Sequence, residues 1–285
     1  MDRLEFLNNK ILEISELKSI INYYYCDGII VTDFLHRLVY FTQKYDFLDE
    51  YIESYLEFIS KNEHKQLKNI KLIPLSSEID YYYYYPIGSY LNFQDSNGMT
   101  PLMNACVNPN LTSEKTIKIL LKYVNHIDLN IDDNYGNTVL MLACKNSNVR
   151  AVKNLLEYKI DLNLKNNNSD NVLTLSKNYK IIKMLLKHDL NINDINNNGD
   201  TALMILCLEP YIQFQTKIIK LLLEKGAKVN IKNDQGYTAL MFATYEVDGL
   251  SSKSEIIKLL MEYGADPNLK NKNGKNTLTL LKKFL

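Results

Sequence analysis

Two kinds of short apolar segment alternate along the chain from about residue 95 onward, with polar loops between them. The first kind is compact and almost uniformly apolar, as in residues 139–144. The second kind places apolar residues three and four positions apart, as in residues 218–223, which is the spacing of one helical face. The pattern therefore predicts pairs of short helices that bury one face each and are joined by polar turns.

A motif of the form Gly-x-Thr-x-Leu recurs at the start of each pair of segments. Six copies, of which the third and the sixth are degenerate, begin at Gly98, Gly136, Ser169, Gly199, Gly236 and Gly274. Successive copies lie 38, 33, 30, 37 and 38 residues apart. A period in this range is typical of solenoids built from stacked supersecondary units.

The residues of the motif suit a boundary between a turn and a helix. A leading glycine accommodates a backbone with positive φ, and the threonine two positions later, such as Thr138, is a favoured helix N-cap. Pro101 stands at a first helical position, and Gly226 and Gly264 follow second segments, where a left-handed C-cap is expected. Each unit is thus turn, helix, helix and loop, and stacking buries the faces that one unit alone leaves exposed.

These motifs resemble the ankyrin repeat. Residues 236–243 are similar to the family's Gly-x-Thr-Pro-Leu-His-x-Ala, and residues 260–268 are similar to its Leu-Leu-x-x-Gly-Ala-Asp-x-Asn. The resemblance implies an all-α fold, an ankyrin-repeat solenoid with short hairpin loops, preceded by a helical N-terminal module. The composition and the Thr-x-Leu-Met form resemble ankyrin proteins of large DNA viruses of amoebae (mimivirus-like), with AT-rich protists as the alternative source.

The resemblance divides the chain into two parts. Residues 93–285 are expected to form the array, with units at about 95–132, 133–165, 166–195, 196–232 and 233–270 and a truncated cap at 271–285. The third unit is three residues short between its helices, and we expect clipped helix ends there. Residues 1–92 carry no recognisable copy and are expected to form a helical module that caps the first unit. A separate partner-binding domain, such as an F-box-like adaptor, and degenerate ankyrin-like units are the alternatives.

Charge and composition narrow the classes of function. The 285 residues carry 33 basic and 33 acidic side chains, so the chain has no bulk attraction to nucleic acid or anionic lipid. Residues 1–92 carry 9 basic and 14 acidic side chains, and the opposite excess elsewhere is too small for a nucleic-acid footprint. The first residues lack a signal-type apolar core, and no run of about 18 apolar residues occurs. We therefore expect an intracellular protein of the cytoplasm or nucleus, not secreted, that binds neither nucleic acid nor membranes.

Candidate chemistry is sparse. No phosphate-binding loop, dinucleotide fingerprint or nucleophile elbow is present. Cys106, Cys144 and Cys207 recur at one position of their units, which indicates packing in preference to catalysis or metal binding. His126 and His188 both follow second helices, where a positive imidazole suits the helix C-terminus. We expect no enzyme activity, no cofactor and no metal, and an unrecognised active site in residues 1–92 is the alternative.

The resemblance implies a non-enzymatic module that binds a protein partner, such as a host protein, through the concave face of hairpin loops and first helices. The alternative is an adaptor whose repeats select a substrate while residues 1–92 recruit other machinery, such as a ubiquitin ligase. The partner-binding candidates come from the family's variable positions: Tyr237, Tyr245, Leu208, Glu209, Asp234, Asp200, Lys145, Asn146, Tyr179 and Asn137. Tyr237, Tyr245 and Leu208 are predicted to be neighbours and to form the hot spot, because exposed tyrosine is a common interface anchor.

Overall fold

The computed structural model describes residue 53 and residues 91–109, 111–209, 212–244 and 250–281. These ranges cover nearly all of the predicted repeat array. The helices predicted in residues 1–92 lie outside the described residues, apart from the isolated position 53 and the last two residues of that range.

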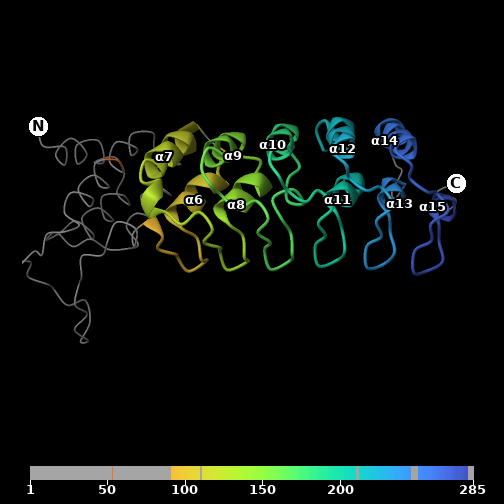
Figure 1. Cartoon of the computed structure of the whole chain (residues 1–285), viewed down its shortest axis with the longest axis horizontal. Helices are drawn as coiled ribbons and strands as arrows, with labels where there is room; N and C mark the ends of the chain where they lie inside the picture. The colour runs from red at the N-terminus through yellow and green to blue at the C-terminus, as the bar shows by residue number, and fades with distance from the viewer. Residues whose placement is uncertain (1–52, 54–90, 110, 210–211, 245–249, 282–285) are drawn as a thin grey trace, which may run out of the picture.

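The described helices form two rows that run along the array, and hairpin loops project from the inner row, at the lower edge of Figure 1. The inner row holds α6 (Pro101–Val107), α8 (Val139–Lys145), α11 (Ala202–Leu208), α13 (Ala239–Ala243) and α15 (Thr277–Leu281). The outer row holds α7 (Leu111–Leu121), α9 (Val149–Leu155), α10 (Tyr179–Leu185), α12 (Gln215–Glu224) and α14 (Leu250–Glu262), and a 3-10 turn, η3 (Val124–His126), follows α7. In the described part of the chain, extended pairing is confined to isolated bridges, so the predicted all-α fold is confirmed.

The inner helices begin at the side-chain caps that the motif predicts. Thr100, Thr138, Thr201 and Thr238 each accept a hydrogen bond from the backbone N–H three residues ahead, at 3.3–3.5 Å. Each bond satisfies a donor that the first turn of a helix leaves free. The glycines that lead the motif have φ values between 74° and 80°, and Ser169 takes a similar conformation (φ 58°) in the third unit. The predicted roles of glycine and threonine are therefore confirmed.

The apolar core runs along the array between the two rows. It begins at Leu91 and continues to Ala265, with each unit burying residues from both of its helices or, in the third, from a turn and a helix. Cys106, Cys144 and Cys207 are completely buried in this core, which confirms the packing role predicted for them. No unit could bury these side chains without its neighbours, so the array folds as a stack.

The third unit has no inner helix. Residues 172–175 form turns where the other units place an inner helix, whereas α10 keeps seven residues, the same length as α9. The expectation that helix ends are clipped is therefore wrong in its location, because the shortening falls on the inner helix alone. Three residues are nearly one turn of helix, and a seven-residue inner helix that loses them keeps only about one turn, which is a poor helix. The outer helix persists because it buries Ile181, Ile182 and Leu185 between its neighbours.

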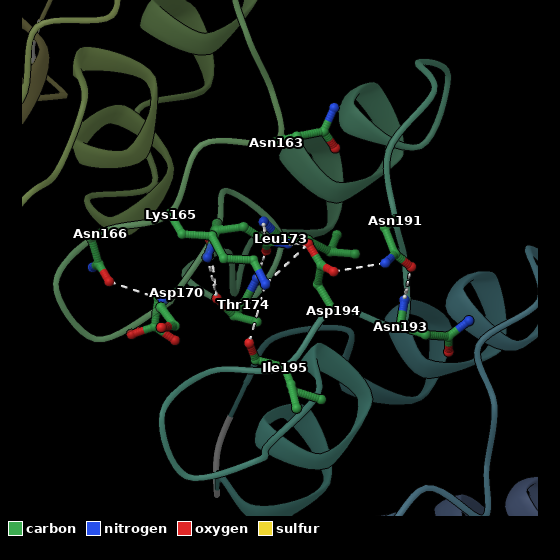
Figure 2. A network of polar contacts seen from close by, with 12 residues as sticks. Asn163, Lys165, Asn166, Asp170, Leu173, Thr174, Asn191, Asn193, Asp194 and Ile195 are labelled. Atoms are coloured by element: carbon green, nitrogen blue, oxygen red, sulfur yellow. Dashed lines mark hydrogen bonds and ion pairs between the residues drawn. The ribbon is translucent and has the colours of Figure 1, made fainter.

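A polar network holds the third unit where the helix is missing, and Figure 2 shows part of it. The Oδ1 atom of Asn171 accepts from two backbone N–H groups of the turn, at 2.9 and 3.0 Å. Its Nδ2 donates to Asp194 Oδ2 at 3.3 Å. The same carboxylate contacts Lys165 Nζ at 3.5 Å and accepts from Asn191 Nδ2 at 2.7 Å. Asp194 therefore ties the turn of the third unit to the loop that leads into the fourth.

Candidate functional site

One Asp or Asn side chain organises each hairpin loop, and we call this residue the loop anchor. Its Oδ1 accepts from the backbone N–H groups two and four residues ahead, at 2.8–3.0 Å in all six hairpin loops of the described residues. The loop anchors are Asp95, Asp133, Asn166, Asn196, Asn233 and Asn271. We call the residue four places later the loop-end residue, and these are Met99, Asn137, Asp170, Asp200, Tyr237 and Lys275.

A ladder of side-chain hydrogen bonds joins the loop anchor of one unit to the loop-end residue of the unit before it. At three junctions the anchor Nδ2 donates to the loop-end Oδ1: Asn166 to Asn137 (2.8 Å), Asn196 to Asp170 (3.3 Å) and Asn233 to Asp200 (2.8 Å). At the first junction the loop-end residue is Met99, which has no side-chain oxygen, and the next anchor is Asp133, which has no Nδ2 donor. Donors and acceptors therefore match at all four of these junctions.

The junction between the fifth unit and the C-terminal unit breaks this match. Its loop anchor is Asn271, which is 5% exposed and whose Nδ2 is buried without a hydrogen-bond partner. The loop-end residue before it is Tyr237, which has no carboxyl or carboxamide oxygen to offer. A buried donor without a partner costs about 1–3 kcal/mol. The fifth unit thus carries a residue that is unfavourable for the stability of the junction.

Tyr237 stacks on Phe242 of α13. The two ring centroids lie 5.3 Å apart and the ring planes differ by 17°. Both side chains are half-buried, so the pair presents an aromatic surface at the junction of loop and inner helix. Sequence reasoning selected Tyr237 but missed Phe242, because the repeat motif leaves that position unspecified.

Two of the predicted carboxylates lie beside Tyr237. Asp200 accepts from Asn233, whose Oδ1 accepts in turn from the Tyr237 N–H at 2.8 Å. Burial raises the pKa of Asp200, the hydrogen bond from Asn233 lowers it, and the carboxylates of Asp234 and Asp170 raise it further. Asp234 is exposed at the loop. The structure therefore brings Tyr237, Asp200 and Asp234 together.

A second group of candidates lies where inner segments end and outer helices begin in the third and fourth units. Leu208 is 39% exposed, and Glu209 forms an ion pair with Lys177 at 2.8 Å. The ring of Tyr179 lies 6.2 Å from that of Phe214, which is 51% exposed. Phe214 has a φ of 60°, a left-handed conformation that is unfavourable for a bulky side chain. Sequence reasoning missed Phe214, which directly precedes α12 at a position that the repeat motif leaves unspecified.

The prediction for Asn137 as an exposed contact residue is wrong. Its side chain is 2% exposed. Its Nδ2 donates to both carboxylate oxygens of Asp133, and its Oδ1 accepts from Asn166. The ladder therefore occupies this side chain and withdraws it from the surface.

The remaining candidates are scattered. Lys145 is exposed at the end of α8, and Asn146 is half-buried and donates to the Leu142 carbonyl at 2.8 Å. Tyr245 lies outside the described residues, so the predicted cluster of Tyr237, Tyr245 and Leu208 stays a prediction.

The described residues hold no group of three or more side chains that could ligate a metal. Burial raises the pKa of Cys144 and of Cys207 to about 12, and it raises the pKa of Cys106 as well. These thiols stay protonated at neutral pH and are poor nucleophiles. In the same part of the chain, every helix is too short or too polar to cross a bilayer.

A family model described as ankyrin repeats (3 copies) matches residues 71–166 and 171–278. No match was found among curated proteins. Ankyrin repeats generally mediate protein–protein interactions.

The family match begins before residue 93, and the bonding pattern of the array also starts early. Asn92 donates through Nδ2 to the His126 carbonyl and accepts through Oδ1 from the Asp128 N–H. Asn193 and Asn230 make the same pair of bonds to the units that follow them. Asn92 therefore occupies the same position as Asn193 and Asn230, which end their units and bond to the unit that follows.

Solved structures share the fold. The ankyrin repeat domain of Bcl-3, of the IkappaB protein family, has a TM-score of 0.62 and 19% identity over 86% of this chain and 92% of that chain. An ankyrin repeat domain from Acinetobacter baumannii has a TM-score of 0.55 and 29% identity over 64% of this chain and 90% of that one. A chain in the complex of the predatory endopeptidase Bd0816 from Bdellovibrio bacteriovorus with the immunity protein Bd3460 has a TM-score of 0.55 and 29% identity, over 67% and 93% of the two chains. The repeated motif, the two stacked rows of helices and the family match together show that this chain belongs to the ankyrin-repeat family.

Proposed function

We propose that this protein is a non-enzymatic binding module that holds a protein partner on the hairpin loops and inner helices of its fourth and fifth units. The observation that carries the proposal is the mismatch of Tyr237 with Asn271.

Stability alone favours Asp or Asn at position 237. The three preceding loop-end residues are Asn or Asp, and each accepts a hydrogen bond from the next loop anchor. Tyr237 gives up that bond, leaves Asn271 Nδ2 unpaired and remains half-exposed. Residues that break the local rule of a fold without a structural gain concentrate at functional sites. Tyrosine is also among the residues most enriched in interface hot spots.

The surroundings of Tyr237 indicate the chemistry of the partner. The stacked Tyr237–Phe242 pair offers an aromatic face, and Asp200 and Asp234 offer carboxylates beside it. A partner that places an apolar or guanidinium group on the rings and donors on the carboxylates is complementary to this surface. The resemblance of the sequence to ankyrin proteins of large DNA viruses of amoebae extends the proposal to a host protein as that partner.

The test is affinity purification of the full chain from cells of its native source, followed by titration of the captured protein. Tyr237→Ala is the test variant, and Tyr263→Ala is the matched control, because Tyr263 is 41% exposed and follows the outer helix α14. Neither change supplies an acceptor to Asn271, so the ladder is equally incomplete in both. We expect Tyr237→Ala to weaken binding by about 30-fold or more, as a hot spot does, and Tyr263→Ala to leave it unchanged.

Equal affinity of the wild-type chain and Tyr237→Ala would contradict the proposal. A partner that ignores Tyr237 but is lost on changes within residues 1–92 would favour the adaptor function instead.

A further inference from the structure

The zero net charge of the chain conceals a separation of charge across the array. The first four hairpin loops, residues 94–100, 132–138, 165–171 and 194–201, carry six acidic side chains and one basic one. The outer helices of the same four units, α7, α9, α10 and α12, carry eight basic and two acidic side chains. In these four units the two edges of the array therefore have opposite charge, which a count along the sequence does not reveal.

The eight basic side chains of these outer helices form a regular grid. One column contains Lys118, Lys153, Lys183 and Lys220, and the other contains Lys115, Arg150, Lys180 and Lys217. Residues three positions apart on a helix lie about 5–6 Å from one another, and packed helices lie about 8–10 Å apart. All eight side chains are exposed. In α14 the second column continues as Glu255, so the grid spans the first four units.

Little of the grid is neutralised. Lys118 and Arg150 share Glu114, at 2.8 and 2.9 Å. Lys183 and Lys217 lie beside the rings of Tyr179 and Phe214, at 6.0 and 5.2 Å from the ring centroids. Among the described residues, no other grid member forms an ion pair. Six like charges on one face therefore remain open to an external polyanion.

We propose that this grid is a docking surface for an anionic membrane. The outer helices contact the membrane, and the hairpin loops point away from it. The outer helices lie in a nearly straight row in Figure 1, and the grid follows this row over four units. A bilayer presents anionic headgroups over a plane, whereas the phosphates of a nucleic-acid duplex curve away from a straight row.

The residue types of the grid favour headgroups over a protein partner. Seven of the eight basic residues are lysine, a compact point charge that lacks the bidentate geometry of arginine. Lysine is depleted in protein–protein interfaces. Phe214, 51% exposed beside Lys217, adds an apolar group at the margin of the grid. Basic residues combined with exposed phenylalanine are typical of segments that lie at a membrane surface.

Vesicle co-sedimentation of the full chain tests the proposal. The vesicles contain phosphatidylcholine alone or phosphatidylcholine with phosphatidylserine, at low and at high salt. The test variant reverses three grid charges, Lys153→Glu, Lys183→Glu and Lys220→Glu. The matched control makes the same change of net charge on the loop side of the array, at the exposed residues Lys232, Lys272 and Lys275.

We expect binding to phosphatidylserine vesicles only, with loss at high salt because the Debye length shortens. Each lysine near an anionic leaflet contributes about fivefold in affinity, so the test variant should bind at least about 100-fold more weakly. The control variant should bind like the wild-type chain, and both variants should retain the wild-type thermal transition.

Absence of binding to phosphatidylserine vesicles overturns the proposal, and so does an equal loss in the test and control variants. Titrations with duplex DNA and with polyglutamate at the same ionic strength cover the other polyanions. If either binds more tightly than the vesicles and depends on the same three lysines, the surface serves that class of partner and not a membrane.

Discussion

Replacing Tyr237 with aspartate should stabilise the junction between the fifth unit and the C-terminal unit, although it removes an aromatic ring from that junction. The fourth unit supplies the template. Asp200 lies between the loop anchors Asn196 and Asn233 and accepts from Asn233 at 2.8 Å. Position 237 lies between Asn233 and Asn271, so an aspartate there meets the same two residue types. We expect its carboxylate to accept the hydrogen bond that Asn271 Nδ2 now lacks.

The expected gain follows from two opposing terms. A hydrogen bond to a charged acceptor contributes about 1.5–3 kcal/mol. Loss of the Tyr237–Phe242 stack costs about 0.5–1.5 kcal/mol. The net stabilisation is about 1 kcal/mol, and Tyr237→Ala, which loses the stack and gains no acceptor, falls about 2 kcal/mol or more below Tyr237→Asp.

Hydrogen exchange of residues 264–281 measures this difference at the junction itself, because the end of a repeat array opens locally before the whole unfolds. Exchange in this segment should be at least about tenfold slower in Tyr237→Asp than in Tyr237→Ala, since about 1.4 kcal/mol corresponds to a factor of ten.

A second substitution removes the mismatch from the other side. Asn271→Asp eliminates the unpaired donor in the way that Asp133 does after Met99, and alone it should also slow exchange. Combined with Tyr237→Asp, it places two carboxylates together, and the double variant should be less stable than either single one. The reasoning is refuted if Tyr237→Asp and Tyr237→Ala exchange at the same rate, or if the two single gains add.

Three further predictions concern the rest of the array. Gly136→Ala should destabilise the protein more than Gly274→Ala in urea unfolding. Both residues have φ near 75° (78° and 74°), but a Cβ at 136 would lie 2.6 Å from Asn167 Oδ1, whereas a Cβ at 274 meets nothing within 4 Å. We expect Gly274→Ala to lower the free energy of unfolding by about 1–2 kcal/mol, because of the left-handed backbone, and Gly136→Ala to lower it by at least about twice as much. Equal losses would show that the close approach of position 136 to Asn167 is unimportant. Asp194→Ala should cost about 1–3 kcal/mol, because it leaves Asn171, Asn191 and Lys165 without their shared acceptor, whereas a loss no larger than that of Asp128→Ala, at an exposed turn, would contradict the role of the network. Finally, stability should fall as pH rises above 9, because burial raises the pKa of Cys144 and Cys207 from 9.0 to about 12. As pH rises, the unfolded chain loses these thiol protons before the folded chain does, so the thiols' contribution to the free energy of unfolding is fully present below pH 9 and falls by about 1 kcal/mol per thiol by pH 10. Urea unfolding at pH 8, 9 and 10 should show a shallower fall in the free energy of unfolding for a variant with alanine at both positions.

The fold could be predicted because its determinants are local. A glycine with positive φ, a capping threonine and an apolar face recur within a few residues of one another, and the structure shows each of them in place. The missing inner helix of the third unit could not be located in this way. The sequence shows that three residues are absent, but which helix loses them depends on which one buries side chains against the neighbouring units. The outer helix keeps Ile182 and Leu185 in the core, so the inner segment becomes a turn held by Asn171.

The binding surface was harder to predict, because exposure is a tertiary property. Position 137 is a variable surface position in the repeat motif, yet Asn137 is buried by bonds to Asp133 and to Asn166 of the next unit. Phe214 directly precedes α12 at a position that the repeat motif leaves unspecified, so its exposure could not be predicted. The basic grid could not be predicted from the counts of basic and acidic residues for a similar reason. Lys153 and Lys183 are far apart in sequence but occupy equivalent places on adjacent helices.

Once the register of the units is known, the ladder becomes readable in the sequence. Loop-end residues with a carboxyl or carboxamide oxygen are followed by an asparagine anchor, and the loop-end Met99 is followed by an aspartate. Tyr237 with Asn271 is the exception among the five junctions. If Tyr237 only fills space, Tyr237→Asp should raise the stability of the junction and leave affinity for the partner unchanged. If Tyr237 is a binding residue, the same substitution should raise stability and lower affinity for the partner. Opposite signs in these two measurements would separate a residue retained for recognition from one that merely fills space.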